Sequence, residues 1–277
     1  MKKIIGIGLI VLFILSCKNY VQVYGTGVVN LNVENDYYVY ENDSLKITYT
    51  FWNEKGLMTF AIFNKLNKPL YIDWKKSSYI DNSVKLNYWV DEVSTKSTDY
   101  YQGYYYKGPL LKPGYVISNS VGVSVSSTVK VERITFLPPK SNYYRSQFYI
   151  LPNNHFLLDK NTQYKEVPRS DNPNKKTKIY EIPYSKKTSP LIFRNFLSFS
   201  MSENFEKEFY VDNEFYISNI QEMDERHFEY KKLDESVNHG KFYIKDENGE
   251  IVKFTDFKKG TSFFRFIPIK SSVESRN

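Results

Sequence analysis

Alanine is almost missing from this chain of 277 residues, in which Ala61 is the only one, whereas there are 25 tyrosines and 20 phenylalanines. Alanine is the best helix former, and aromatic side chains pack well on pleated sheets. The composition therefore disfavours long helices and predicts an all-β protein. With 41% hydrophobic and 17% aromatic residues, the chain carries too much buriable surface for a disordered polymer. Its 12 glycines also exclude a collagen-like repeat.

Cysteine and histidine are also scarce, with one and three residues. The single cysteine, Cys17, has no internal disulfide partner. The three histidines, His155, His227 and His239, have no i, i+4 or H-E-x-x-H spacing. No G-x-S-x-G motif of a serine hydrolase occurs either. The sequence predicts no catalytic residue, no metal site and no cofactor. The acidic residues Asp224 and Glu225 precede His227, and we interpret this cluster as a solvated, charged helix face.

Long hydrophobic runs are absent except at the start. Lys2 and Lys3 are followed by twelve apolar or glycine residues, 4–15, and then by Ser16. A helix of that length spans about 18 Å, which is too short to cross a hydrocarbon core of about 30 Å. Residues 1–16 are therefore predicted to be a cleaved signal peptide. Their removal lowers the formal net charge from +7 to +5.

The segment Ile14-Leu15-Ser16-Cys17 resembles the lipobox of bacterial lipoprotein precursors. The resemblance implies that the Cys17 thiol receives diacylglycerol, that the signal is cleaved before it, and that fatty acids such as palmitate anchor the mature chain. Lys18 after the cysteine, by the same resemblance, favours the outer membrane, with the membrane face left open. The polar, weakly patterned residues 17–30 are expected to be a flexible tether.

Residues 31–223 have the pattern of a β-sandwich body. In residues 45–52, Leu45, Ile47 and Tyr49 alternate with polar residues, which indicates a half-buried strand. A turn at 53–56 and strands at 57–63 and 70–74 follow, and this strand pair resembles that of immunoglobulin-like sandwiches in exported bacterial proteins. The sequence thus predicts an all-β, immunoglobulin-like antiparallel β-sandwich with long loops.

The less regular segments give four further expectations. Residues 153–178 are interpreted as a long surface excursion, residues 212–214 as a hairpin tip, and residues 221–234 as the best helix candidate. Asn248-Gly249 is the strongest short hairpin signal. Residues 224–277 are therefore predicted to be a C-terminal extension with a β-hairpin packed on the body.

A tyrosine cluster within residues 100–106, close to Gly103 and Gly108, is the remaining candidate for binding. Exposed tyrosines offer rigid area with a hydroxyl group, suited to a sugar ring or a protein partner. The alternative is that tyrosine takes the place of leucine or valine in a core. The candidate contact residues, next to Tyr100, are Tyr101, Tyr104, Tyr105 and Tyr106.

The predicted function is a non-enzymatic, lipid-anchored accessory or interaction protein of the bacterial outer membrane. Its partners would be the membrane and an outer-membrane protein complex, with no nucleic acid, since an exported lipoprotein seldom meets one. The alternative is a glycan-binding module in nutrient uptake. A hydrolase with dispersed carboxylates is a third hypothesis, and the acids considered for it are Asp73, Asp91, Glu92 and Asp99.

Overall fold

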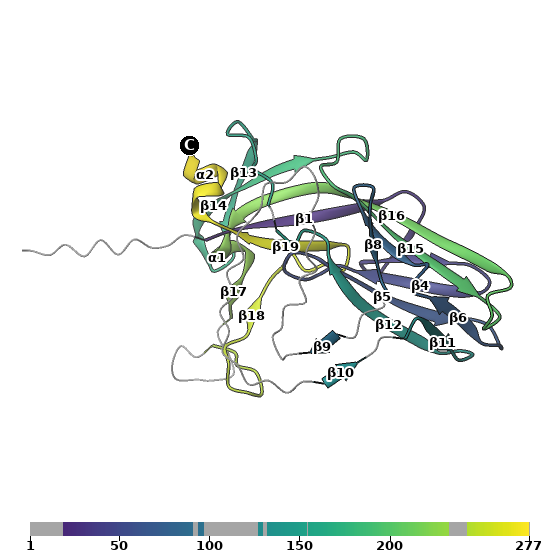
Figure 1. Ribbon diagram of the computed structural model, residues 1–277. Coiled ribbons are helices and arrows are strands. Elements are labelled where there is room, and N and C mark those ends of the chain that lie inside the picture. The colour runs from purple at the N-terminus through teal and green to yellow at the C-terminus, as the bar shows by residue number, and fades with distance from the viewer. Residues whose placement is uncertain are drawn as a thin grey trace, which may run out of the picture.

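The computed structural model describes residues 19–90, 94–96, 127–129, 132–153, 155–232 and 243–276, with only the backbone of 94–96 and 127–129. Strands dominate these residues, and every pair of named strands is antiparallel. Two large sheets lie one over the other (Figure 1). The prediction of an all-β antiparallel sandwich is confirmed.

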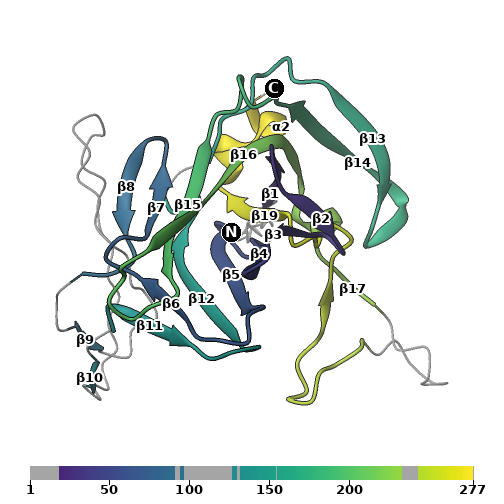
Figure 2. The same cartoon turned by 90° about the vertical axis from the view of Figure 1, so that its right-hand side faces the viewer.

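The larger sheet has ten strands, six of them in the order β11-β6-β15-β16-β1-β19. Their bounds are β1 Tyr20–Val28, β6 Leu70–Asp73, β11 Ile134–Leu137, β15 Ile192–Ser200, β16 Glu208–Asp224 and β19 Ser262–Ile267. The hairpin of β7 (Ser78–Asp81) and β8 (Val84–Asn87) pairs with β15, and that of β13 (Tyr164–Arg169) and β14 (Asn172–Pro183) pairs with β16. Figure 2 shows these two hairpins on opposite sides of the sheet.

The smaller sheet has five strands in the order β12-β5-β4-β3-β2. They are β2 Asn32–Glu34, β3 Tyr37–Glu41, β4 Leu45–Thr50, β5 Leu57–Asn64 and β12 Asn142–Tyr149. Two further pairs join β9 (Ser94–Lys96) to β10 (Ser127–Val129), and β17 (Tyr230–Lys231) to β18 (Lys253–Phe254). The short helices are α1 Glu225–Phe228, η1 Ile269–Ser271 and α2 Val273–Arg276.

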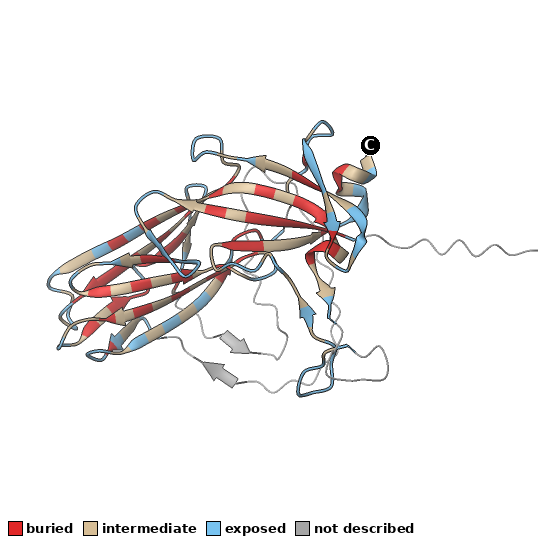
Figure 3. Ribbon diagram, turned by 180° about the vertical axis from the view of Figure 1, so that it is seen from behind, coloured by how far each residue is buried: buried red, intermediate tan, exposed pale blue. Residues whose placement is uncertain are grey.

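The main core lies between the two sheets. On β4 the alternation is as predicted, because Leu45, Ile47 and Tyr49 are fully buried while the residues between them are half-buried. Phe51 and Phe215 meet edge to face with their ring centroids 5.1 Å apart, a favoured aromatic geometry. Buried positions line the inner faces of the strands, and exposed ones gather in the loops and on the outer strands (Figure 3).

The first strand, β1, lies inside the large sheet, paired with β16 on one side and with β19 on the other. Both of its faces are covered, since Tyr24 belongs to the main core while Val21 and Val23 pack with Met223 and Phe228 in a second cluster. The expectation of a flexible tether over residues 17–30 is therefore wrong for residues 20–28.

Four other expectations are also corrected. Most of the predicted surface excursion at residues 153–178 belongs to a hairpin of regular strands, because β13 covers Tyr164–Arg169 and β14 begins at Asn172. Residues 212–214 lie within the continuous strand β16, which extends to Asp224 and leaves only four residues helical in the predicted helix. Residues 262–267 are a strand of the large sheet, so the body does not end at residue 223.

The Asn248-Gly249 turn is present as expected. The Asp246 carboxylate accepts the N–H groups of Asn248 and Glu250, each at 2.9 Å, and Gly249 has a φ of +80°. A left-handed residue is what such a tight turn requires.

Candidate functional site

The residues predicted to bind lipid or ligand lie outside the described residues. They are Cys17 and the tyrosines Tyr101, Tyr104, Tyr105 and Tyr106, together with Tyr100. The described chain begins at Asn19, two residues after Cys17. The region around Asn19 is therefore the part of the body nearest to the expected lipid.

The start of β1 is held by contacts on several sides. The Asn19 carbonyl accepts the N–H of Glu225 at 3.0 Å. Tyr20 pairs with Asp224 on one side and Ile267 on the other, and its hydroxyl donates to Glu274 at 2.9 Å. Burial and the neighbouring Glu274 carboxylate raise the pKa of the Tyr20 hydroxyl. The chain is thus already part of the folded body at Asn19 and Tyr20.

A buried polar network lies next to this point. The Gln22 amide donates to Glu222 at 2.9 Å and to the carbonyl of Phe156 at 2.7 Å, and the other Glu222 oxygen accepts the N–H of Val273 at 2.6 Å. Burial raises the pKa of the Glu222 carboxyl, although these hydrogen bonds oppose the shift. The network attaches the C-terminal helix α2 to the large sheet.

The β13–β14 hairpin extends past the start of β1. Ile179 pairs with Met223, so the preceding residues of β14 reach beyond the end of β16 at Asp224. At the hairpin turn the Ser170 N–H donates to Nδ1 of His227 at 3.2 Å, and its hydroxyl lies 3.0 Å from the same nitrogen. The interpretation of His227 as part of a solvated helix face is wrong, because the side chain is buried.

The contact between Ser170 and His227 has the length of a nucleophile–base pair. Its surroundings do not resemble a catalytic site, because within the described ranges no carboxylate forms a hydrogen bond with the imidazole. Burial lowers the pKa of His227, which favours the neutral ring as an acceptor. The contact joins the hairpin turn to α1.

The outer half of this hairpin is basic. Residues 164–178 contain five basic and two acidic side chains. Glu166 lies 3.7 Å from Lys176, and Asp171 pairs with Arg169. Lys165, Lys175 and Lys176 are exposed. A positive surface therefore lies at the end of the large sheet where β1 begins.

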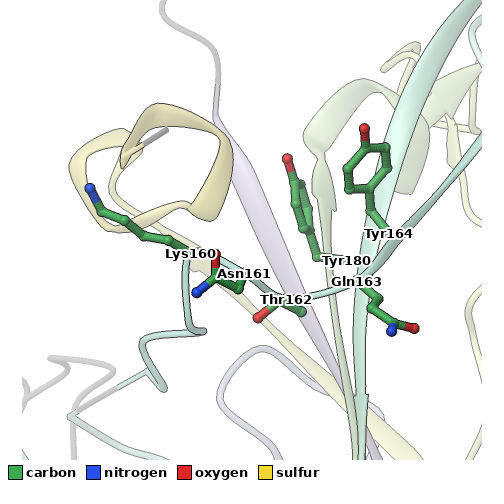
Figure 4. Close-up of a pocket in the computed structure, with 6 residues that line it drawn as sticks. All are labelled: Lys160, Asn161, Thr162, Gln163, Tyr164 and Tyr180. Carbon is green, nitrogen blue, oxygen red and sulfur yellow. The ribbon is translucent and has the colours of Figure 1, made fainter.

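A shallow hollow of about 400 Å³ lies at the base of the same hairpin (Figure 4). Tyr164 and Tyr180 lie side by side there, with ring centroids 5.4 Å apart and ring planes at 54° to each other; Tyr164 is 51% exposed and offers the aromatic face, whereas Tyr180 is buried beside it. Lys178 lies 4.4 Å from the Tyr164 ring centroid. The other lining residues are Lys160, Asn161, Thr162 and Gln163. Flat aromatic surface beside amide groups suits a polar ring such as a sugar.

Tyr164 and Tyr180 were not predicted as binding residues from the sequence. Both were placed in or beside the supposed surface excursion. The signal that could have revealed them is the turn-forming run Ser170-Asp171-Asn172, which joins two segments containing β-branched and aromatic residues.

Of the four acids considered for a hydrolase, only Asp73 lies in the described part of the chain. Asp91, Glu92 and Asp99 lie outside it. Asp73 is buried against Arg133, whose Nη2 donates to it at 2.7 Å. Burial alone would raise the pKa of Asp73, but the hydrogen bond and charge of Arg133 hold it below its usual value. This carboxylate is occupied by a structural ion pair.

No metal-binding group of three or more His, Cys, Asp or Glu side chains is present among the residues that the structure describes. In the same residues, no helix has the length and apolarity needed to span a membrane. Comparison of the chain with family models, with curated proteins and with solved structures found no match.

Proposed function

We propose that this chain is a lipid-anchored protein of the bacterial outer membrane that acts by non-enzymatic interaction with a partner. The lipobox at Ile14-Leu15-Ser16-Cys17 supports the anchor. One structural observation determines what the anchor would do to the body: Asn19, two residues after Cys17, is already part of the fold. Two residues span at most about 7 Å, so a lipid on Cys17 would hold the body directly at the bilayer surface.

The anchor is tested by growing the host with labelled palmitate. The native chain should incorporate the label and fractionate with membranes, and Cys17→Ser should lose both properties. Ser16→Ala is the matched control, since it keeps a small residue before the cysteine and should be processed and labelled normally. Label in the Cys17→Ser chain, or unchanged membrane fractionation of that chain, would refute the anchor.

The interaction role is tested separately by affinity purification of the native lipoprotein in mild detergent. We expect a stable outer-membrane partner in stoichiometric amount. Recovery as a free monomer under all detergent and salt conditions would contradict this part of the proposal.

Glycan binding at the hollow is the second candidate function, and the Tyr164–Tyr180 pair favours it. The side-chain amide of Asn161 lines the hollow and forms no hydrogen bond among the described residues, so it is available to sugar hydroxyls. Binding of cellotetraose, laminaritetraose and N-acetylchitotetraose is measured by calorimetry. Tyr164→Ala should lower the affinity for a bound sugar about tenfold, equivalent to ~1.4 kcal/mol.

The matched control is Tyr144→Ala, which removes a 71% exposed tyrosine from β12 in the other sheet. It should leave sugar affinity unchanged. Equal losses in the two variants, or no binding of any of the three sugars, would refute a glycan site at the hollow.

A further inference from the structure

We infer that the end of the large sheet where β1 begins is a membrane-contacting surface, with the β13–β14 hairpin against anionic lipid headgroups. The inference rests on the proposed lipid anchor and adds an orientation of the body. It concerns a defined set of elements: the start of β1, the outer half of β13–β14, α1, η1 and α2.

Chain connectivity selects this end of the molecule. Asn19 lies next to α1 through its hydrogen bond with Glu225, and Tyr20 contacts α2 through Glu274. Figure 1 shows α1, α2, β13 and β14 gathered at this end. A lipid attached two residues before Asn19 would bring this end of the sandwich to the bilayer.

The opposite end of the sheet is far away. The turn between β15 and β16 covers residues 201–207, and β16 runs from there to Asp224 beside Tyr20. Sixteen residue steps along a strand amount to about 50 Å. The two ends therefore provide one position near the bilayer and one remote from it.

The chemistry of the near end suits a membrane surface. The exposed lysines Lys165, Lys175 and Lys176 can approach lipid phosphates, and lysines near an anionic surface are attracted to it. Two large apolar side chains are also exposed, Leu157 by 65% and Ile269 by 44%. Arg276 donates to the carbonyl of Leu158 at 2.6 Å, which joins the Leu157 segment to α2, next to η1. Apolar residues beside lysines are typical of interfacial membrane contact.

The orientation is tested in the lipidated protein reconstituted into vesicles. Since Cys17 is the only cysteine, and its thiol is blocked in the lipoprotein, an introduced cysteine can be labelled alone with a fluorophore. Asn174→Cys places it on the hairpin, and Glu203→Cys places it at the remote turn; both positions are exposed. Quenching by a headgroup nitroxide lipid should be several-fold stronger at residue 174 than at residue 203.

The role of charge is tested in the Asn174→Cys chain by adding Lys175→Gln and Lys176→Gln. Vesicles containing phosphatidylglycerol should quench residue 174 more than pure phosphatidylcholine vesicles, and the double substitution should remove that difference. The expected loss is about fivefold in the membrane-contact equilibrium for each lysine, or ~1 kcal/mol. The same double substitution in the Glu203→Cys chain controls for general effects on folding or reconstitution.

Three different failures are distinguishable. Absence of palmitate from the native chain would overturn the proposed anchor itself. Normal lipidation and vesicle association, combined with equal quenching at residues 174 and 203, would overturn the orientation alone. Quenching that is stronger at residue 174 than at residue 203, but does not change with lipid charge or with the lysine substitutions, would overturn the contact with anionic headgroups.

Discussion

Tyr49→Phe should destabilise the fold because the Tyr49 hydroxyl connects the two sheets. Tyr49 lies on β4 of the smaller sheet and is fully buried. Its oxygen accepts the amide N–H of Asn213 at 2.8 Å and that of Asn195 at 3.2 Å, both from the larger sheet. Removing the oxygen leaves two buried amide donors without this acceptor.

The magnitude follows from that count. A buried donor left unpaired costs about 1–3 kcal/mol, so two donors give an expected loss of about 2–4 kcal/mol after partial rearrangement. Asn195 keeps one bond, because its carbonyl oxygen accepts the Tyr88 hydroxyl at 2.8 Å. Urea unfolding of the mature chain, followed by far-ultraviolet circular dichroism, measures the change in the free energy of unfolding.

Two companion variants sharpen the test. Tyr144→Phe removes a hydroxyl from a side chain that is 71% exposed and should change stability by less than about 0.5 kcal/mol. Adding Asn213→Leu to Tyr49→Phe removes one of the unpaired donors and should recover part of the loss. A loss below about 0.5 kcal/mol for Tyr49→Phe would refute the reasoning.

Three further predictions concern buried charge and close packing. Burial raises the pKa of Glu222 above its ordinary 4.5, so the free energy of unfolding should fall as pH rises from about 4.5 through the folded-state pKa. Glu222→Gln should flatten this pH dependence in urea titrations, and an unchanged dependence of stability on pH in the variant would contradict the prediction. Arg133→Ala should cost about 1–3 kcal/mol at neutral pH by leaving Asp73 without its main partner. Because the pKa of Asp73 is lowered from 3.8, that cost should shrink as pH falls through the folded-state value, and a pH-independent cost measured by thermal melts would count against the ion pair. At Gly25 an added Cβ would lie 1.8 Å from the Asn219 side-chain oxygen, so Gly25→Ala should lower stability by about 1–3 kcal/mol. Asn219→Ala in the same chain should restore most of that stability, and failure to restore it would show that the clash is not with Asn219.

The strands with one covered face could be predicted from the sequence. On β4 the period of two is visible because inward and outward positions differ in polarity. The turn that follows was also predictable, since Gly56 adopts a φ of +67° there. In both places local chemistry and tertiary environment agree.

Strands covered on both faces could not be found in this way. On β1, Gln22 and Thr26 are buried between apolar residues, so the segment shows no alternation and resembles a polar linker. Gln22 is tolerated because Glu222 and the Phe156 carbonyl accept its amide. These partners are more than a hundred residues away, and no local pattern reveals them.

A buried asparagine explains why residues 212–214 were wrongly predicted to be a hairpin tip. The polar run at residues 212–214 has the composition of a turn, yet Asn213 points into the core, where Tyr49 accepts its amide. The β13–β14 hairpin was not predicted for a related reason. Its outer half is exposed, so its strands tolerate polar and proline residues, which from the sequence resemble a loop. Cys17 and the Tyr101–Tyr106 cluster stay predictions from sequence.

The position of β1 between β16 and β19 has a consequence for how the chain acquires its structure. The first strand finds one neighbour only when residue 224 has emerged and the other only when residue 267 has emerged. Pairings so distant along the chain close slowly. A polypeptide delivered from its amino end must therefore leave β1 without one of its two strand neighbours until nearly the whole chain has been delivered, and a truncation before residue 262 would leave β1 as an unpaired sheet edge.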